Sequence, residues 1–504
     1  MTTSRLIDSL PCSVELPAGG GKTWLVVDTL REAAAASGKT LVLTHTHAGV
    51  HSIRNKMRTL GVSPDTARVG TITSLAFELA RSYSRIAGLA VPDTPNWDES
   101  ARYIEGACRV LRNRHIRDVM AISYSHVLID EYQDCSLAQH ELTLELARAV
   151  PACAVFGDRL QGIFGFRDAI VEWESDVLPH FPAFPVDYVP HRWAEHNQPL
   201  GQWLYAIRDR LQPGSRIAFD ADLPGGVAFV PATPQRFELR DAALQSRPDG
   251  ESVVIIAPPD KGSARSIASR LNGAYTTMED IGGNFMIDAF AKLEANEPGK
   301  FALWLACLAK KCFTGYSELN RTVLKRLEKG TTVSSLTRPG LARTLAALDS
   351  VLANPMFETL GDSMREIRAA KEALPHSREA WNDMATALEH CGSEADRSPT
   401  AELGRVRDRL RHGGRRPSTR TVSRTVLIKG LEYDHVIISD LDRLTDHCNL
   451  YVALTRARKS VTIIGRTATI TVSETRRSPN PRKSPAGSSN GKRKARAIVN
   501  SCGS

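Results

Sequence analysis

Several features are missing from this sequence of 504 residues, and each absence excludes a class of protein. None of its nine cysteines belongs to a C-x-x-C pair, which argues against a zinc knuckle or a disulfide framework and favours a reducing, cytoplasmic location. No apolar run approaches the roughly twenty residues that span a bilayer, so we expect no membrane partner. The first residues lack a basic stretch leading into a long apolar core, so we expect no secretory signal.

Length, composition and charge limit what remains. A chain of 504 residues is too long for one ordinary core, which predicts about two to four domains. With 42% hydrophobic and 24% charged residues, the composition is typical of a soluble globular protein. The formal net charge of +9 suits a polyanionic partner. Part of that charge lies in residues 473–504, which we expect to be a disordered basic tail because they combine Ser, Pro, Gly, Lys and Arg with few apolar residues.

The first strong pattern is the segment "AGGGKT" at residues 18–23, between a short apolar strand and an Ala-rich helix. In a strand, loop and helix context, glycines let backbone N–H groups approach phosphates, a lysine reaches the terminal phosphates, and a threonine hydroxyl binds Mg²⁺. The candidate nucleotide-binding residues are Gly19, Gly20, Gly21, Lys22 and Thr23. The formal pattern has glycine at position 16, which is leucine here, and a glycine-rich turn without a ligand is the alternative.

The second pattern is "HVLIDEYQD", in which an apolar strand ends in two adjacent carboxylates. Neighbouring carboxylates repel each other, so a strand end that carries two of them usually holds a cation. Together with the glycine loop, the pair predicts an ATP and Mg²⁺ site in which Asp130 holds the metal and Glu131 polarises the attacking water.

The segment "DEYQD" resembles the corresponding motif of the UvrD/Rep-type superfamily 1 DNA helicases. Five more segments resemble motifs of that family in the same order, and together they extend to about residue 465: "VGTITSLAFELA", "VFGDRLQGIFGFRDA", "VPHRWAEHN", "LIKGLEYDHVII" and "NLYVALTRARKSVTIIG". Because the order is kept, the resemblance covers most of the chain. The last two segments are the most specific.

The resemblance implies roles for individual residues. Those implied on the nucleotide side are Gln161, Arg192, Gly430, Glu432 and Arg456, the two arginines reaching the terminal phosphate. Those implied on the single-stranded DNA side are Thr71, Ser74, Phe164, Phe166 and Arg167. Aromatic stacking on bases is worth about 1 to 3 kcal/mol per base, but core packing of the same rings is the alternative.

The chain departs from the family at three places. Family members carry a Gln before the phosphate loop that reads adenine, whereas the first Gln of this chain is Gln133, so other nucleoside triphosphates remain open as substrates. His45 and His47 stand near a Thr-Asn-Lys of the family, which predicts a weaker or pH-dependent phosphate contact. Val426 and Leu427 replace a His-Ser pair, and these changes leave RNA open as an alternative to DNA.

The expected fold is α/β, with two RecA-like P-loop NTPase domains whose parallel sheets hold the nucleotide at the carboxyl ends of their strands. We expect the first domain at 1–212, with a small accessory insertion at about 77–125, and the second at 213–279 and 413–472. Apolar residues recur at three and four between 280 and 412, which predicts a helical insertion. The basic stretch 405–424 is either a solvated segment or a DNA-backbone contact.

The function that the resemblance implies is an ATP-dependent translocase or helicase on single-stranded DNA, or on a junction of single and double strands, with 3′-to-5′ polarity. The alternative is a DNA-responsive regulatory ATPase that gates a partner nuclease in a bacterial repair or defence complex. The compact length is similar to that of the helicase-like subunits of anti-phage systems such as Gabija. A passive single-strand binder is disfavoured by Glu131 and the two arginines.

Overall fold

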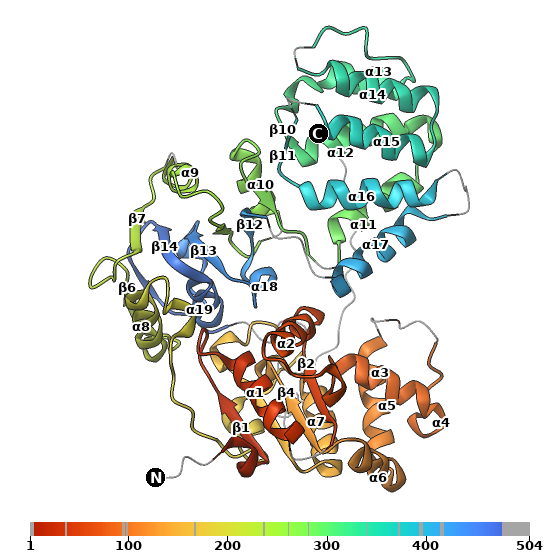
Figure 1. Ribbon diagram of the computed structural model, residues 1–504. Helices are drawn as coiled ribbons and strands as arrows, with labels where there is room; N and C mark the ends of the chain where they lie inside the picture. The colour runs from red at the N-terminus through yellow and green to blue at the C-terminus, as the bar shows by residue number, and fades with distance from the viewer. Residues whose placement is uncertain are drawn as a thin grey trace, which may run out of the picture.

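The computed structural model describes residues 5–475, except 36–37, 93–95, 97–98, 166–167, 235–236, 261, 281, 339, 371–372, 393–396 and 414–417. Two parallel sheets of five and six strands form the α/β fold of two RecA-like domains, and a helical body projects from the second (Figure 1). Most of the expected tail, 476–504, lies outside the described residues. Within the described ranges, no helix is long and apolar enough to cross a membrane.

The first sheet is parallel throughout, in the order β1-β5-β4-β2-β3. Its strands are β1 (Cys12–Glu15), β2 (Thr40–Thr44), β3 (Ala67–Thr71), β4 (His126–Ile129) and β5 (Cys153–Gly157). Helices cover both faces, so its inner strands are apolar runs without alternation; Val127 and Ile129 face one side and Leu128 the other, all with no exposed surface.

Two separate helical layers cover this sheet. On one face pack α1 (Lys22–Ala35) and α2 (His47–Thr59). On the other pack α3 (Ile72–Ser82), α5 (Ser100–Arg112) and α7 (Leu137–Ala149). Between α3 and β4, where the sequence predicts a small insertion, the α-helices of the described residues are α4 (Ser84–Ala87), α5 and α6 (Arg114–Ser123).

The second sheet is also parallel, in the order β7-β14-β13-β8-β12-β9. Its strands are β7 (Val227–Pro231), β8 (Val253–Ile256), β9 (Thr276–Thr277), β12 (Arg420–Ser423), β13 (Tyr433–Ile438) and β14 (Ala457–Gly465). A separate antiparallel pair joins β6 (Arg216–Ala218) to β15 (Thr469–Thr471). The helices that accompany this sheet are α8 (Gln198–Ala206), α9 (Phe237–Leu244), α10 (Ser263–Arg270), α18 (Thr425–Ile428) and α19 (His447–Thr455).

The packing of α8 differs from the expected domain limit near residue 212. Trp193, Leu200 and Leu204 belong to the same buried cluster as Val254 and Tyr451 of the second domain. The chain therefore crosses to the second domain about twenty residues earlier than the sequence suggests. No change in composition marks this crossing, because α8 is an ordinary amphipathic helix whose partner surface lies far away in sequence.

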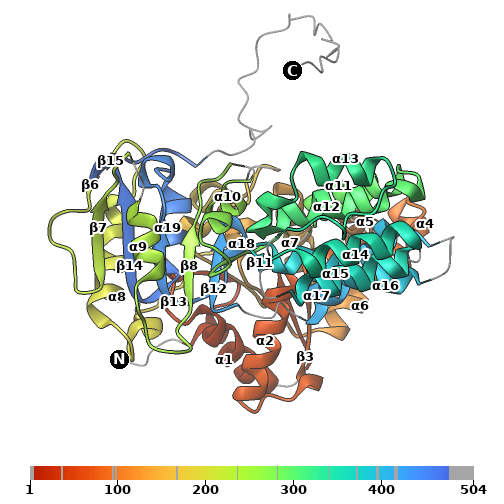
Figure 2. The ribbon, with the colours of Figure 1, turned by 90° about the horizontal axis from the view of Figure 1, so that it is seen from above.

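The helical body is inserted between β9 and β12 and has a hydrophobic core of its own, around Phe290, Trp304 and Trp381. Its elements are α11 (Asn284–Glu294), α12 (Phe301–Cys312), β10 (Phe313–Thr314), α13 (Arg321–Glu328), α14 (Ala342–Ala353), α15 (Phe357–Arg368), β11 (Leu374–Pro375), α16 (Arg378–Cys391) and α17 (Pro399–Gly413). Seen from above, these helices stack beside the second sheet (Figure 2).

Candidate nucleotide and nucleic-acid site

The site in the first domain is built from the ends of neighbouring strands. Strands β1, β5 and β4 are adjacent and parallel, so the loops that leave their carboxyl ends meet at one edge of the sheet. These loops carry the glycine segment with Lys22, then Asp158, and then Asp130 with Glu131. The order of strands therefore brings together residues that are more than one hundred positions apart in the chain.

Aromatic side chains from other segments pack closely against the glycine loop. Gly19 and Gly21 have φ angles of 75° and 84°, which residues with a Cβ rarely adopt. A Cβ on Gly19 would lie 2.4 Å from the ring of Trp193, and one on Gly20 would lie 2.9 Å from the ring of Tyr188. Leu16, at the position where the formal pattern has glycine, has 2% of its surface exposed and fills the core beneath the loop.

Lys22 and the acidic pair form a buried charge cluster. The Nζ of Lys22 lies 2.9 Å from Oε1 of Glu131 and 3.6 Å from Oδ1 of Asp130. Burial lowers the pKa of Lys22, but the two carboxylates outweigh burial and raise it. Burial raises the pKa of Asp130 to about 6, although Lys22 opposes this, whereas Lys22 and Lys429 overcome burial and hold the pKa of Glu131 well below its usual value. Glu131 also has a φ of 58°, a strained conformation of the kind found at functional sites.

The oxygen donors at this place suit Mg²⁺. Mg²⁺ is usually bound by one or two carboxylates together with waters and substrate phosphates, and not by a closed protein cage. Asp130 offers a carboxylate at the strand end, and Thr23 offers a hydroxyl in the first turn of α1. In the described part of the chain, no group of three or more His, Cys, Asp or Glu could hold a metal ion alone. The donors present fit a magnesium ion delivered with a nucleotide.

Lys429 reaches this cluster from the second domain. Its ammonium bonds the carboxylate of Asp134 and the main-chain oxygen of Gln161, and lies 3.8 Å from Oε2 of Glu131. Only 7% of its side chain is exposed. Gly430 and Glu432 are predicted from the motif, but this lysine is not. Its position directly before Gly430 in a motif assigned to the nucleotide was the available signal.

The two predicted arginines also lie where the domains meet. Nη2 of Arg192 is 2.9 Å from Oε1 of Glu432, and its Nη1 donates to the main-chain oxygen of Thr455 at 2.5 Å. Nη2 of Arg456 donates to Oε1 of Gln161 at 3.0 Å. Burial, followed by the charge of Arg192, lowers the pKa of Arg456 to about 10. Each arginine is held by a protein oxygen in a place where a phosphate can compete.

The nucleotide-side residues of the second domain lie at the amino ends of its strands, whereas we expected them at the carboxyl ends. Glu432 directly precedes β13, and Arg456 directly precedes β14, so both lie at the amino ends of their strands. The expectation that carboxyl ends carry the nucleotide therefore describes the first sheet only. The carboxyl edge of the first sheet therefore faces the amino edge of the second sheet. A single motif does not reveal which edges of the two sheets meet.

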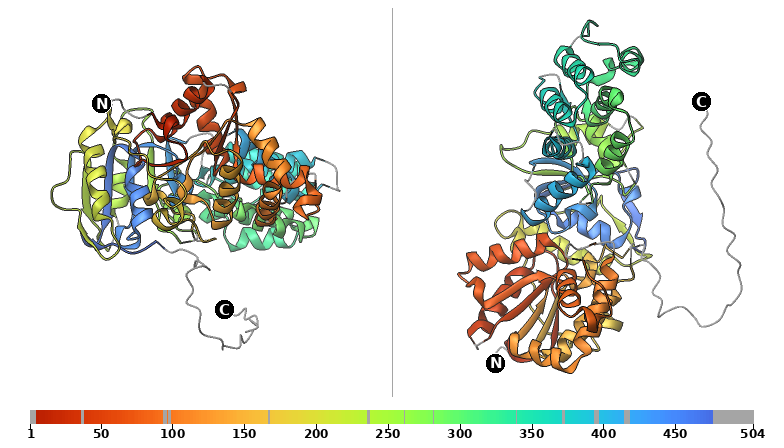
Figure 3. Two further views of the ribbon diagram at one scale, coloured as in Figure 1. Left: turned by 90° about the horizontal axis from the view of Figure 1, so that it is seen from below. Right: turned by 90° about the vertical axis from the view of Figure 1, so that its right-hand side faces the viewer.

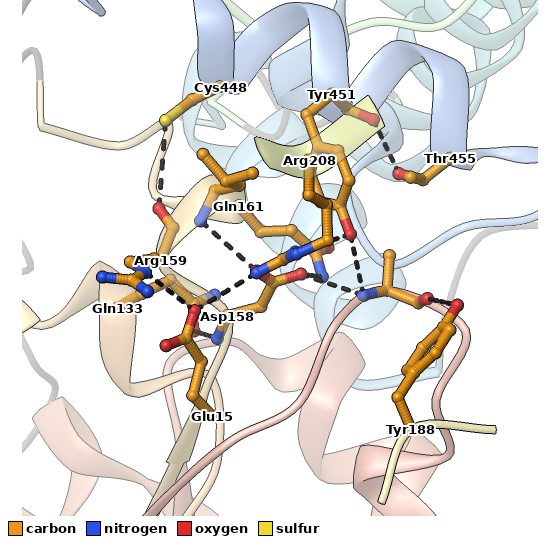
Figure 4. A network of polar contacts seen from close by, with 12 residues as sticks. Glu15, Gln133, Asp158, Arg159, Gln161, Tyr188, Arg208, Cys448, Tyr451 and Thr455 are labelled. Atoms are coloured by element: carbon orange, nitrogen blue, oxygen red, sulfur yellow. Dashed lines mark hydrogen bonds and ion pairs between the residues drawn. The ribbon is translucent and has the colours of Figure 1, made fainter. Parts of the chain in front are cut away.

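A second buried network connects the domains behind the phosphate loop (Figure 4). Nη1 of Arg208 donates to Oδ1 of Asp158 and to the hydroxyl of Tyr451, both at 2.8 Å. The main-chain N of Ala18 donates to Oδ2 of Asp158 at 2.9 Å, and Nε2 of Gln161 donates to the same oxygen at 2.9 Å. Sequence reasoning named only Gln161 of this set. The acid that directly follows an apolar strand in "AVFGD" was the signal for Asp158.

The predicted DNA contacts differ in their surroundings: one is a half-buried ring, two lie at a helix start, and two lie outside the described residues. Phe164 is half-buried, stacks on His45 with 6.0 Å between ring centroids, and has the ammonium of Lys429 5.2 Å from its ring. Thr71 caps α3: its Oγ1 accepts from the main-chain N of Ser74 at 3.0 Å and donates to the hydroxyl of Ser74 at 2.7 Å. Both hydroxyls therefore have a structural role at this helix start. The predicted DNA contacts Phe166 and Arg167 lie outside the described residues.

The structure shows the surroundings of His45 and Val426, two positions at which the chain departs from the family. Burial lowers the pKa of His45, so its ring is largely neutral at pH 7. Val426 packs against Ile163, Cys448 and Val452, so this position is an apolar contact between the two domains. Gly430 has a φ of 82°, which explains glycine between Lys429 and the following strand.

The two RecA-like domains thus bring a glycine loop, strand-end carboxylates and two arginines together at their contact. Residues 96–181 match the family of the UvrD/REP helicase N-terminal domain. A probable DNA helicase of Mycoplasma pneumoniae is 36% identical over 80 residues, which are 16% of this chain and 15% of that relative. The chain thus resembles the superfamily 1 helicases of the UvrD/Rep type, and this prediction from the motifs is confirmed.

A solved structure with partial similarity is the Pif1 helicase of Candida albicans. It shares 13% sequence identity with this chain at a TM-score of 0.30. The match covers 55% of this chain and 53% of the Pif1 chain. The likeness is too distant to inform the role of any residue.

Proposed function

We propose that this protein is an ATP-dependent translocase or helicase that moves along single-stranded DNA, with 3′-to-5′ polarity. The observation that carries the proposal is the meeting of opposite charges between the domains. Lys429 of the second domain pairs with Asp134 of the first, and Arg456 bonds Gln161, beside the cluster of Lys22, Asp130 and Glu131. Two arginines on one side of a phosphate site can neutralise transferring phosphoryl charge only when the domains close.

The proposed chemistry uses groups that are now engaged with each other. With Mg²⁺ held by Asp130 and Thr23, the metal supplies charge neutralisation at the phosphates. Lys22 then exchanges Glu131 for a phosphate oxygen, and this frees the Glu131 carboxylate to orient water. Arg192 exchanges Glu432 for a phosphate in the same way.

Hydrolysis is coupled to DNA through the segment from Gln161 to Phe164. Gln161 bonds Arg456 and Asp158 through its side chain, and its main-chain oxygen accepts from Lys429. Three residues later, Phe164 offers a ring to a DNA base. Thr71, Ser74, Phe166 and Arg167 stay predicted DNA contacts. Movement of Gln161 when the phosphate leaves is therefore transmitted over a few bonds to the stacking ring.

The test is steady-state phosphate release from ATP in magnesium buffer, with and without a poly-dT strand. We expect turnover that rises with the strand and falls at least a hundredfold in Glu131→Gln, within the range of about 10² to 10⁴ for a general base. Glu105→Gln, at a side chain on α5 that is 76% exposed, is the matched control and should keep wild-type turnover. Turnover in Glu131→Gln equal to that in the control would overturn the assignment.

A regulatory ATPase that gates a partner nuclease is the second candidate. Between α3 and β4 the described residues form α4, α5 and α6 and no sizeable accessory domain, which suits a subunit of a larger assembly. Strand displacement on a tailed duplex separates the two candidates, because only the motor unwinds it without a partner. DNA-stimulated turnover without displacement favours the regulatory role.

A further inference from the structure

The backbone of Glu131 has a conformation that its neighbours must hold in place. Its φ of 58° and ψ of 35° lie in the left-handed region, which a residue with a Cβ rarely adopts. Such strain persists only where the surrounding structure over-determines it. The main-chain oxygen of Glu131 accepts from the main-chain N of Asp134 at 3.1 Å and closes the short helix η4 (Tyr132–Asp134). The conformation of Glu131 therefore depends on what fixes η4.

The contacts of the Glu131 carboxylate are not a lasting support. Its oxygens accept from Nζ of Lys22 at 2.9 Å and from Nε2 of Gln133 at 2.5 Å, and Nζ of Lys429 lies 3.8 Å away. In the proposed function, a phosphate takes Lys22 away from Glu131, and Lys429 belongs to the other domain, whose position changes on closure. Two of the three contacts therefore change during the reaction, and the main chain must be held from another side.

Tyr132, the residue after Glu131, is fixed in the core of the first domain. None of its surface is exposed. Its hydroxyl lies 2.7 Å from Nδ1 of His140, and its ring meets that of Phe181 edge to face, with 6.2 Å between the centroids. Burial raises the pKa of Tyr132 well above its usual value, so the hydroxyl keeps its proton and donates it to Nδ1 of His140.

His140 is itself held by the start of α7. It has 2% of its surface exposed, and its main-chain N donates to the oxygen of Ser136 at 2.9 Å. Ser136 and Gln139 close a capping box at this helix start. Helix α7 packs on the opposite face of the first sheet from α1, and the right-hand view of Figure 3 shows this sheet between its two helical layers. The helix start therefore fixes Nδ1 of His140 from outside the nucleotide site.

We propose that His140 is a positioning residue for Glu131 and acts through the hydroxyl of Tyr132. The hydrogen bond fixes the side chain of Tyr132, and Tyr132 fixes the main chain on its N-terminal side. Glu131 is thereby kept in the strained conformation from which its carboxylate orients water. The role of His140 rests on the proposed function, because Glu131 has its catalytic task only there.

The test measures kcat and KM for ATP with the full chain and saturating poly-dT. His140→Leu removes the acceptor of the hydrogen bond at similar size, and Tyr132→Phe removes the donor. A misplacement of about 1 Å costs about 100-fold in rate, so we expect each variant to lose about tenfold in kcat, with KM within about twofold of the wild type. His115→Leu, at an exposed histidine on α6, is the matched control and should keep the wild-type kcat.

A conservative variant and two double variants show whether the effect passes through this bond to Glu131. His140→Asn keeps an acceptor, Oδ1, near the position of Nδ1 and should recover most of the lost kcat. Tyr132→Phe combined with His140→Leu should lose no more than either single variant, because all three lack the same bond. In the Glu131→Gln background, His140→Leu should change the residual turnover by less than about twofold. A further loss of about tenfold there would indicate a general structural role and overturn the proposal.

Failure of the proposed function gives a different pattern from failure of the positioning role. If Glu131→Gln keeps the turnover of its control, the catalytic task of Glu131 fails, and the role of His140 fails with it. If Glu131→Gln loses turnover while His140→Leu and Tyr132→Phe keep the wild-type kcat, only the positioning role is overturned. A thermal melt accompanies each variant, and Tyr132→Phe decides the outcome if His140→Leu does not fold.

Discussion

At the scale of single residues, the candidate site is a set of charges that neutralise one another. Lys22 is paired with Glu131 and Asp130, and Lys429 with Asp134. Burying such charges is costly unless each has a partner, and here each lysine pairs with a carboxylate. A nucleotide phosphate that approaches Lys22 therefore competes with the carboxylates of Asp130 and Glu131.

Removing the loop lysine should remove nucleotide binding. Lys22→Ala deletes the ammonium that faces the phosphates and leaves Asp130 and Glu131 to repel them. We expect at least a tenfold loss in nucleotide affinity by calorimetric titration. Lys39→Ala, an exposed lysine beyond α1, is the control and should bind as the wild type does. An unchanged titration for Lys22→Ala would show that the loop does not hold phosphates.

Removing the stacking ring should weaken binding of the strand. Phe164→Ala deletes a face worth about 1 to 3 kcal/mol per base, which corresponds to about 5- to 150-fold in affinity for poly-dT. Anisotropy with a labelled strand measures the loss, and a thermal melt reports whether the fold is kept. A melt lowered by many degrees with unchanged strand affinity would identify Phe164 as a packing residue.

At the scale of elements, the seam between the second sheet and the helical body contains a titratable group. His376 follows β11, has 3% of its surface exposed, and lies near Arg265. Burial, and then the charge of Arg265, lower the pKa of His376 to about 4. His376 is therefore neutral at pH 7 where the second sheet meets the helical body.

Stability should fall as the pH is lowered through this range. The pKa of a histidine in the unfolded chain is about 6.5, so the unfolded state binds a proton first, and the folded state loses stability from about pH 6.5 down to about 4. Between pH 7 and 5 the expected loss is about 2 kcal/mol, measured by urea denaturation at each pH. His376→Gln should flatten this pH dependence, with His115→Gln on α6 as an exposed-surface control. Parallel curves for wild type and His376→Gln would contradict the prediction.

At the scale of the whole molecule, the two domains are connected through buried polar groups. Asp158 of the first domain accepts from Arg208, which in turn donates to Tyr451 of the second. None of the surface of Asp158 is exposed. The contact between the domains therefore combines this buried charged network with the apolar contact at Val426, and breaking the buried ion pair is costly.

Breaking one side of this connection should destabilise the closed arrangement. Arg208→Met leaves Asp158 buried without its cation, and breaking such a pair costs about 3 to 5 kcal/mol. Urea denaturation of the variant should show this loss, and Arg208→Met combined with Asp158→Asn should recover part of it. A double variant less stable than the single one would show that Asp158 acts through Ala18 and Gln161 instead.

The fold class and much of the site could be predicted because their signals are local. The glycine loop and the strand that ends in Asp130 and Glu131 are short segments whose chemistry is visible without a partner. The inserted helices followed from apolar periodicity, whereas the second sheet followed from the resemblance to the helicase family. The sequence did not reveal on which side of the domain limit α8 lies. The apolar face of α8 is compatible with the core of either domain, and distant residues decide against which core it packs.

By itself, the sequence determined which chemical groups are present and the order in which they occur. The tertiary structure alone decided which of them meet: Lys429 with Asp134, Arg208 with Asp158, and the second domain's residues at the amino ends of their strands. The physical reason is that ion pairs and domain contacts join residues tens to hundreds of positions apart, as Lys429 and Asp134 are separated by 295. Only the packing of sheets and helices brings such residues within reach of one another.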